Sequence, residues 1–495
     1  MRNRRDAIET RSFKRRFSLK KKDLRRLIIV VSLVTALAVV VPLMSGCLPG
    51  RPAVAPPEAP PAAPPEVAPP EVPKVVTAKI GFLAPLTGPV AGWGLPGFYG
   101  DEIWVEHFNA KGGLTLSDGT QVLVELVPYD NEYITEKALT GAKKLVLEDE
   151  VVLVQMLGGA TAAAAVPFMT DQMIVSTTLL PSDLTTSTLY HLAPIEVCPF
   201  YNVTGVEWLA INKPELKTFY QVAQDDELGR PGMAAMNAAA EAAGLEVIDY
   251  ELFDPETTDF APIVSKMIAS GADILSWGIS YPDYVNLLTF EAYNQGYEGQ
   301  LHSCTLDFYD AVIEKTSVEF MEGFIWQFPD FDDPAMQEPL NPYRLIQPSV
   351  FWDDYQEDYA GTWSAVSWEY QAQLDQWMQA VIAADSIDPM KVFAAWKRPK
   401  ENNIYHAFGE GTWWGKPFWG IDNAFMAPWP VVEMQNGKAV IVEFRDQLDW
   451  WERNKEVMVQ WNMDLDEMWW QRMGIDMESG IKMWGLEEEF GYLLD

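Results

Sequence analysis

The sequence is poor in the two residue types that most often build disulfide frameworks and metal sites. It has three cysteines and four histidines among 495 residues. So few cysteines exclude a disulfide-rich scaffold. A bridge between Cys198 and Cys304 stays open, although two buried thiols are the interpretation we favour. The histidines are widely separated: His107, His191, His302 and His406. Because no close spacing such as HExxH occurs, we predict neither a metal site nor another cofactor.

Common catalytic and nucleotide-binding motifs are also missing. No GxGxxG or Walker pattern follows an expected strand. The segment 278–282 reads Gly-Ile-Ser-Tyr-Pro and lacks the last glycine of the GxSxG elbow found in many hydrolases. Asp254, Glu256 and Asp259 have the spacing of an ordinary polar loop. A hydrolase is therefore the weaker alternative, and we do not expect an enzyme.

Basic residues become scarce after position 26. Residues 1–26 hold 12 lysines and arginines, so the rest of the chain has 24 of the 36 basic residues against 68 of the 71 acidic ones. Such an acidic body repels phosphate backbones, which argues against nucleic-acid binding. The acidity would suit a cationic ligand, although a solvated acidic surface is the simpler interpretation.

The basic start leads into an uncharged, mostly apolar run over 27–41, which is the order of regions in a secretory signal. The run ends in Leu-Met-Ser-Gly-Cys at 43–47, where small residues precede Cys47. This ending resembles the lipobox of bacterial lipoproteins, in which the cysteine receives acyl chains after cleavage, although Met44 replaces the usual leucine. We predict lipidation of Cys47, with an uncleaved membrane-spanning helix as the alternative. Either interpretation places the body outside the cytoplasm and at a membrane.

Proline and alanine dominate the segment that follows, which we assign as a tether over 47–77. Such a composition favours extended polyproline structure of about 3.1 Å per residue, enough to hold the body up to roughly 80 Å from the membrane.

The body shows apolar strand patterns that alternate with helix patterns. We expect a first series of strands at 78–84, 121–129, 151–156 and 173–177, with helices at 98–109, 132–148 and 160–171. A second series has strands at 217–223, 245–253, 273–278 and 300–304, with helices at 231–243, 262–270 and 282–294. Alternation of this kind predicts α/β lobes built on parallel sheets, whose ligands bind beyond the carboxyl ends of the strands.

Two segments carry a family resemblance. Residues 80–94 read IGFLAPLTGPVAGWG, and residues 108–114 read FNAKGGL. Both resemble the opening of the branched-chain amino-acid type of periplasmic binding protein, typified by the leucine/isoleucine/valine-binding protein. Weaker matches follow at 224–229, 278–282, 322–324, 368–370 and 431–443, so the resemblance covers roughly 80–445.

The resemblance implies the type I periplasmic-binding-protein fold: two doubly wound parallel-sheet lobes joined by a three-strand hinge, here with an extra C-terminal extension. We place the hinge crossings near Cys198, Phe328 and Met426. The implied partners are a small-molecule solute and the permease and ATPase subunits of an ABC importer, with a ligand-sensing receptor subunit as the alternative. The expected divisions are a signal peptide (1–46), the tether, lobe 1 (78–198 and 329–426), lobe 2 (199–328 with a closing hairpin at 427–445) and the extension (446–495).

Five loops are expected to meet at the cleft. In the family, the tryptophan matching Trp93 lies against the ligand, and Tyr281 has a counterpart that reaches it from the second lobe. The glycine-rich loop would offer backbone N–H groups to a carboxylate, although amino-acid binders usually have serines there. A third loop, which follows a buried strand, would offer hydroxyls or carbonyls to an ammonium or amide group of the solute, although threonines at a strand end also form plain turns. The expected contacts on the glycine-rich loop are Gly159, Ala160 and Thr161, and those on the third loop are Thr177, Thr178 and Leu179.

The fifth loop departs from the amino-acid binders. Thr305 falls near the place where they have a glutamate that pairs with the ammonium group, and Asp307 follows two residues later. The solute class therefore stays open among amino acids, amides, urea and aromatic acids. The long aromatic-rich segment 329–363 and the extension are further departures, and the spacing of Trp461, Leu465 and Met468 predicts an amphipathic helix packed on the body, with partner docking as the alternative.

Overall fold

The structure is a computed structural model that describes residues 74–465 and 476–491, except Pro89, 198–199, 201–202 and 227. The chain divides into a unit over 1–71 and a unit over 72–495, and all described residues belong to the second. The predictions about Cys47, Cys198 and Met468 therefore lie outside the described residues. No described helix is long and apolar enough to cross a membrane.

The first lobe is built on a six-stranded sheet with the order β2-β3-β1-β4-β5-β6. Its strands are β1 (Val75–Ala84), β2 (Leu114–Thr115), β3 (Gln121–Asp130), β4 (Leu153–Met156), β5 (Val175–Thr177) and β6 (His191–Leu192). All neighbours are parallel except β2 and β3. The central strand β1 is fully buried from Phe82 to Ala84, as expected for a parallel sheet with helices on both faces.

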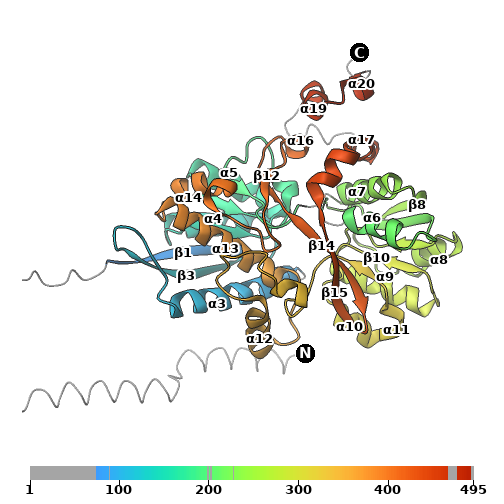
Figure 1. The fold of residues 1–495 in the computed structure, drawn as a ribbon, viewed down its shortest axis with the longest axis horizontal. Coiled ribbons are helices and arrows are strands. Elements are labelled where there is room, and N and C mark those ends of the chain that lie inside the picture. Colours follow the sequence, from blue (N-terminus) through green and yellow to red (C-terminus); the bar gives the residue numbers. More distant parts are fainter. Residues whose placement is uncertain are drawn as a thin grey trace, which may run out of the picture. The chain divides into compact units, whose positions relative to one another are not determined.

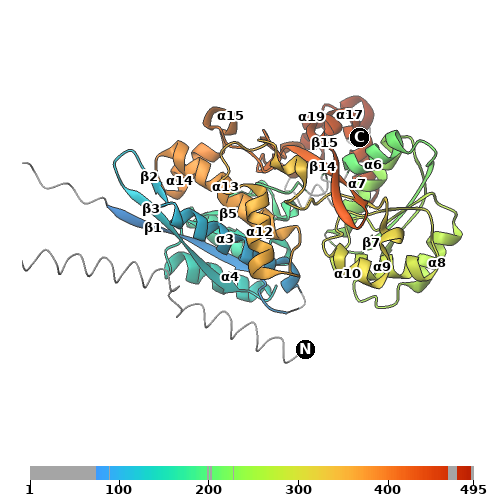
Figure 2. The same cartoon turned by 60° about the horizontal axis from the view of Figure 1, so that its bottom comes forward.

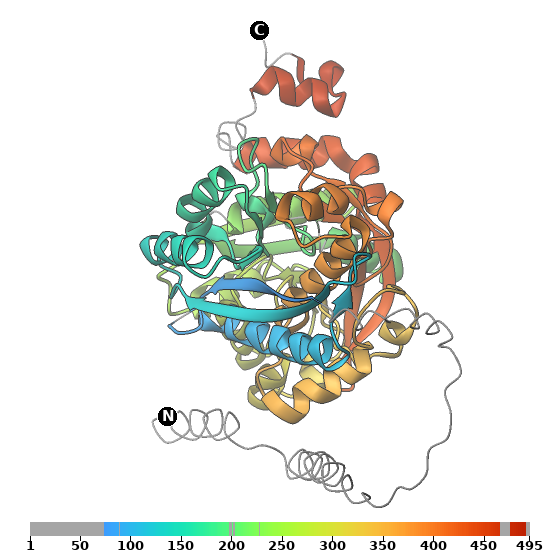
Figure 3. The same ribbon diagram turned by 90° about the vertical axis from the view of Figure 1, so that its left-hand side faces the viewer.

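Helices cover this sheet: α3 (Leu95–Ala110), α4 (Thr135–Leu147) and α5 (Ala162–Asp171). Figure 3 shows the blue helix α3 running along the strands of the first lobe. The first strand begins at Val75, three residues before the expected start at Ala78. The strand starts early because Val75 pairs with Gln121 on β3, which extends the β1–β3 ladder into the end of the segment assigned as the tether.

The second lobe has a seven-stranded sheet with the order β15-β14-β11-β10-β9-β7-β8. Its strands are β7 (Thr218–Gln224), β8 (Glu246–Phe253), β9 (Ile274–Ser276), β10 (Gln300–His302), β11 (Ile325–Trp326), β14 (Pro428–Gln435) and β15 (Lys438–Asp446). The first five are parallel, whereas β14 and β15 form an antiparallel hairpin at the edge. The helices are α6 (Val203–Asn212), α7 (Gly229–Ala242), α8 (Ala261–Ala269), α9 (Pro282–Asn294), α10 (Tyr309–Lys315) and α11 (Val318–Met321).

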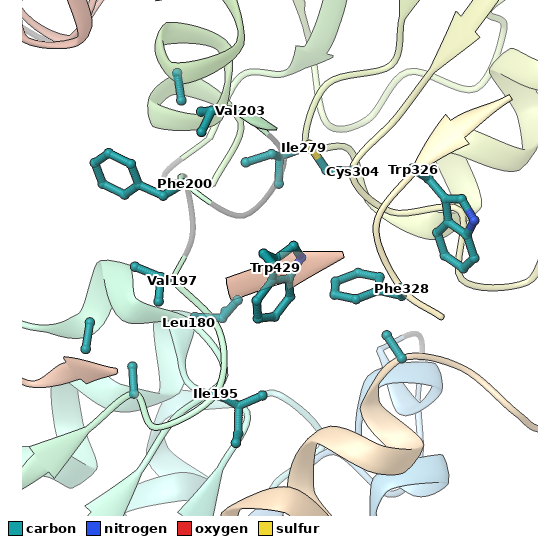
Figure 4. Packing of buried hydrophobic residues seen from close by; sticks show 14 of the residues in the cluster. Leu180, Ile195, Val197, Phe200, Val203, Ile279, Cys304, Trp326, Phe328 and Trp429 are labelled. Atoms are coloured by element: carbon teal, nitrogen blue, oxygen red, sulfur yellow. The ribbon is translucent and has the colours of Figure 1, made fainter. Parts of the chain in front are cut away.

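The chain passes between the two sheets three times, as Figures 1 and 2 show. It leaves the first lobe after β6, returns after β11, and reaches the second sheet again between β13 (Ala424–Met426) and β14. Buried aromatic side chains pack where the crossings meet, with the Phe328 and Trp429 rings 6.2 Å apart (Figure 4). The predicted fold class is confirmed.

The returning segment adds helices to the first lobe. They are α12 (Pro348–Tyr359), α13 (Val366–Ala384), α14 (Pro389–Trp396), α15 (Pro399–Asn402) and α16 (Lys416–Trp419), with β12 (Thr412–Trp414) paired to β13. Helix α13 packs closely on α3, because Gly97 and Gly100 leave no Cβ in its way. Its first four turns are almost completely buried, which makes each polar residue there costly unless it has a partner.

The extension forms α17 (Gln447–Leu465), α19 (Met477–Trp484) and α20 (Glu487–Phe490). Helix α17 packs on α6 and α7 of the second lobe, and the indole of Trp461 donates to Glu241 at 2.8 Å. On its buried face, Trp451 lies 5.5 Å from Phe200 at the first crossing and 5.2 Å from Trp414. The described part of the extension therefore contacts both the second lobe and the hinge.

Candidate functional site

A small cavity lies between the two lobes and takes its lining from both. The first lobe contributes Trp93, Leu157, Leu179, Leu180, Glu196, Ala365, Val366 and Glu369, and the second contributes Leu228, Thr305, Asp307 and, at the crossing, Phe328. Its volume is about 30 Å³. On this measure a water molecule needs roughly 10 to 15 Å³, so the cavity has room for a compact head group.

Trp93 and Tyr281 meet across the cleft. Trp93 ends the short turn Ala91–Trp93 after β1, and Tyr281 immediately precedes α9. Their ring centroids are 5.1 Å apart with an interplanar angle of 65°, an edge-to-face contact. Such pairs stabilise by about 0.5–1.5 kcal/mol beyond the apolar area they bury. The two aromatic residues singled out from the sequence thus face each other from opposite lobes.

The glycine-rich loop is already occupied by a carboxylate of the protein itself. The backbone N–H of Gly159 donates to both oxygens of Asp183, each at 3.0 Å, and the hydroxyl of Thr178 donates to the same carboxylate at 3.0 Å. Burial raises the pKa of Asp183, while His191, Thr178 and the Gly159 N–H lower it. The donors expected to hold a solute carboxylate therefore have an internal acceptor.

Three other polar groups of these two loops are also engaged within the first lobe. The Thr161 hydroxyl donates to the Gly158 carbonyl at 2.7 Å, and the Ala160 carbonyl accepts from Thr135 at 3.1 Å. The Thr177 hydroxyl donates to the amide oxygen of Gln373 on α13. Of the six residues named on these loops, only Leu179 lines the cavity.

On the second-lobe side, Thr305 and Asp307 both line the cavity. The Thr305 hydroxyl donates to the Ser280 carbonyl, so it fixes the loop beside Tyr281. Asp307 is 5% exposed, and one of its carboxylate oxygens meets no donor among the described residues. Burial raises the pKa of Asp307 to about 7, although the Trp93 indole and the Ala365 N–H partly oppose this shift.

The sequence interpretation missed two further acids that line the cavity. Glu196 lies in the first crossing and is 7% exposed, and Glu369 lies in the first turn of α13 and is 0% exposed. No described N–H or hydroxyl group donates to either oxygen of Glu369, whose carboxyl group instead adjoins that of Glu196. A sequence signal existed for both, because each acid interrupts an otherwise apolar or aromatic stretch, Ala193–Val197 and Val366–Tyr370.

The three acids influence one another's ionisation across the cavity, and burial favours the neutral form of each. Burial raises the pKa of Glu369 well above its ordinary value, and the charges of Glu196 and Asp307 raise it further. Burial also raises the pKa of Glu196, and the charge of Asp307 adds to that rise. No lysine, arginine or histidine is among the described residues that line the cavity. Within the described part of the chain, no group of histidine, cysteine or acidic side chains is arranged to hold a metal ion.

Comparisons with known proteins agree with this architecture. Curated relatives are the Leu/Ile/Val-binding protein homolog 3 of Brucella melitensis, 25% identical over 205 residues, and the Leu/Ile/Val-binding protein BraC3 of Rhizobium johnstonii, 26% identical over 214 residues. The matches cover 40% and 41% of this chain, and the chain spans about half the length of each relative, 53% and 55%.

Solved structures share the fold at low identity. A leucine-binding protein from Thermotoga maritima has a TM-score of 0.59 and 18% identity, over 75% of this chain and 99% of that one. A solute-binding protein of an ABC transporter from R. palustris, in complex with 4-hydroxybenzoate, has a TM-score of 0.58 and 18% identity, over 76% and 99%.

The sequence comparison covers the body as a whole. Residues 77–439 match the family described as periplasmic binding protein, which spans both sheets and all three crossings. The resemblance to the Leu/Ile/Val-binding type, expected from the two N-terminal segments, is confirmed. The chain belongs to the periplasmic binding protein family.

Proposed function

We propose that the protein is an extracytoplasmic solute-binding subunit that captures a small polar solute between its lobes and delivers it to an ABC importer. The observation that carries this proposal is a cavity lined by residues of both lobes. A solute in that position touches both halves at once and so favours the arrangement in which they meet. Exclusion of water from the cavity strengthens each polar contact with the solute.

The proposed solute contacts are the predicted residues that line the cavity or cap it: Trp93, Leu179, Tyr281, Thr305 and Asp307. The other predicted site residues are proposed to support the cavity wall: Gly159, Ala160, Thr161, Thr177 and Thr178. We add Glu196 and Glu369 to the proposed contacts, because both carboxyl groups lie in the lining.

We further propose that acyl chains on Cys47 anchor the protein to the membrane. The support is the basic, apolar and small-residue order that ends at this cysteine. Mass spectrometry of the protein extracted from membranes should show the added acyl mass on an N-terminal Cys47. A Cys47→Ala variant that stays anchored without acylation would contradict the proposal and favour an uncleaved helix.

A thermal-shift screen of the purified protein tests solute capture. The panel contains amino acids, amides, urea, aromatic acids and amines, each at a concentration far above the micromolar range. A solute present at 100 times its Kd stabilises the folded state by about 2.7 kcal/mol, which is readily seen as a rise in Tm. No shift with any member of the panel would argue against solute capture, and chemical turnover of a member would indicate an enzyme instead.

A further inference from the structure

Three carboxyl oxygens of the cavity acids accept no hydrogen bond from an N–H or hydroxyl group among the described residues. They are both carboxylate oxygens of Glu369 and one oxygen of Asp307. The two side chains are 0% and 5% exposed, so bulk water does not satisfy them. A buried carboxylate without partners is costly, and such groups in native proteins usually serve a ligand or a chemical step.

An ammonium group matches this set of acceptors. A primary ammonium has three N–H donors and no acceptor, so it can donate to oxygens of both Glu369 and Asp307 at once. Its positive charge also compensates the three acids of the cavity, none of which has a basic neighbour among the described lining residues. The small volume of the cavity suits a head group of about the size of a water molecule.

The rest of the lining favours an organic cation. The side chains of Leu157, Leu179 and Leu228 form apolar walls, which suit an alkyl chain. The rings of Trp93 and Phe328 add faces that attract a cation. A metal ion fits less well, because no described cluster has the arrangement of a metal site.

A solute carboxylate would have to compete with Asp183 for two of its expected donors. The Gly159 N–H and the Thr178 hydroxyl donate to Asp183, so the loop that would clamp a carboxylate holds one already. A second carboxylate near this loop would also be repelled by Asp183 and by the three cavity acids. These contacts argue against a solute carboxylate, such as that of a free amino acid, at the glycine-rich loop.

We infer that the solute is a primary alkylammonium compound whose amine is held by Glu369 and Asp307, and that it needs no carboxylate. This inference rests on the proposed function, because it names the class of solute for the same cavity. Glu196 would add charge compensation from the first crossing.

Four compounds that share a 3-methylbutyl chain provide the test. They are leucine, the amine that lacks its carboxylate (3-methylbutylamine), the acid that lacks its amine (4-methylpentanoic acid) and the neutral 3-methylbutan-1-ol. Calorimetric titration of the full lipoprotein in detergent should give the amine a Kd at least about tenfold lower than that of leucine, with no heat from the acid or the alcohol. Tighter binding of leucine or of the acid would overturn the inference but leave solute capture intact.

Matched variants locate the interaction. Glu369→Gln and Asp307→Asn keep the shape of the side chains and remove the charge, and each should weaken amine binding about 10- to 100-fold, as expected when a hydrogen bond to a charged group is lost. Glu256→Gln, an exposed acid in the loop before α8, is the control and should bind the amine like the wild type. Unchanged amine binding in both cavity variants would overturn the inference.

The two proposals fail in different ways. If no amine binds while a neutral or acidic member of the wider screen does, the ammonium assignment is wrong and solute capture stands. If neither the amines nor any other compound binds, both are wrong. Circular dichroism of each variant separates a loss of binding from a loss of the fold.

Discussion

A buried acid without a cationic partner makes the free energy of unfolding of the solute-free protein depend on pH. The raised pKa of Asp307 allows the size of this dependence to be calculated. The pKa of Asp307 rises from an ordinary 3.8 to about 7 on folding, mainly because of burial. The folded state therefore binds this proton more tightly than the unfolded state does. Stability is then highest below the unfolded pKa and is lost as the pH rises through the folded pKa.

The magnitude follows from the shift. Each pKa unit corresponds to about 1.4 kcal/mol, so the whole shift of Asp307 is worth on the order of 4 kcal/mol. Between pH 5 and pH 8 the part that is lost is roughly 2 to 3 kcal/mol, because some of the change occurs below pH 5. Glu196 from the crossing and Glu369 from α13 face the same cavity, and the pKa of each is also raised, so they act in the same direction.

Urea unfolding of the ligand-free protein from pH 5 to pH 8 measures this loss. The Asp307→Asn variant has no proton to lose there, so its free energy of unfolding should gain roughly 2 to 3 kcal/mol relative to the wild type over that range. The exposed-acid variant Glu256→Gln should instead follow the wild type throughout. Parallel curves for Asp307→Asn and the wild type would refute the reasoning, because they would mean that Asp307 is charged and compensated.

Three other substitutions test separate parts of the structure. Trp93→Ala removes the ring that meets Tyr281 and should weaken solute binding about tenfold or more, with little change in Tm since Trp93 is only half-buried; titration followed by tyrosine and tryptophan fluorescence measures it. Asp183→Ala leaves the Gly159 N–H and Thr178 hydroxyl without their acceptor and should cost about 1–3 kcal/mol in urea unfolding, a result that a merely exposed aspartate would not give. Trp451→Ala removes a fully packed ring beside Phe200 and should lower the free energy of unfolding by about 3–5 kcal/mol; a loss under about 1 kcal/mol would mean that the ring does not hold the extension in place.

Periodicity and turn residues were enough to predict most of the fold. The helix expected at 282–294 is α9 with the same bounds, because Pro282 starts it and the apolar spacing continues to its end. The fold class followed from the alternation of strands and helices together with the two family-like segments. The antiparallel hairpin was also expected from the resemblance, and Asn436 and Gly437 in its turn both have the positive φ that such a turn requires.

The site was only partly predictable, because its chemistry depends on residues distant in the chain. Trp93 and Tyr281 were found through the resemblance. In contrast, Asp183 reaches Gly159 across 24 positions, and no local pattern shows that it fills the glycine-rich loop. Glu369 entered the sequence analysis only within the family-like segment 368–370, and its burial depends on how α13 packs against α3.

The aromatic contact between the C-terminal helix and the hinge has a mechanical consequence. Trp451 lies against Phe200, which stands between β6 and α6, where the chain passes from the first sheet to the second. Because α17 packs on α7 of the second lobe, it braces this crossing from one side. Under the proposed function, the extension would therefore limit how far the lobes swing apart, and so how fast a captured solute escapes, without itself contributing to the cavity lining.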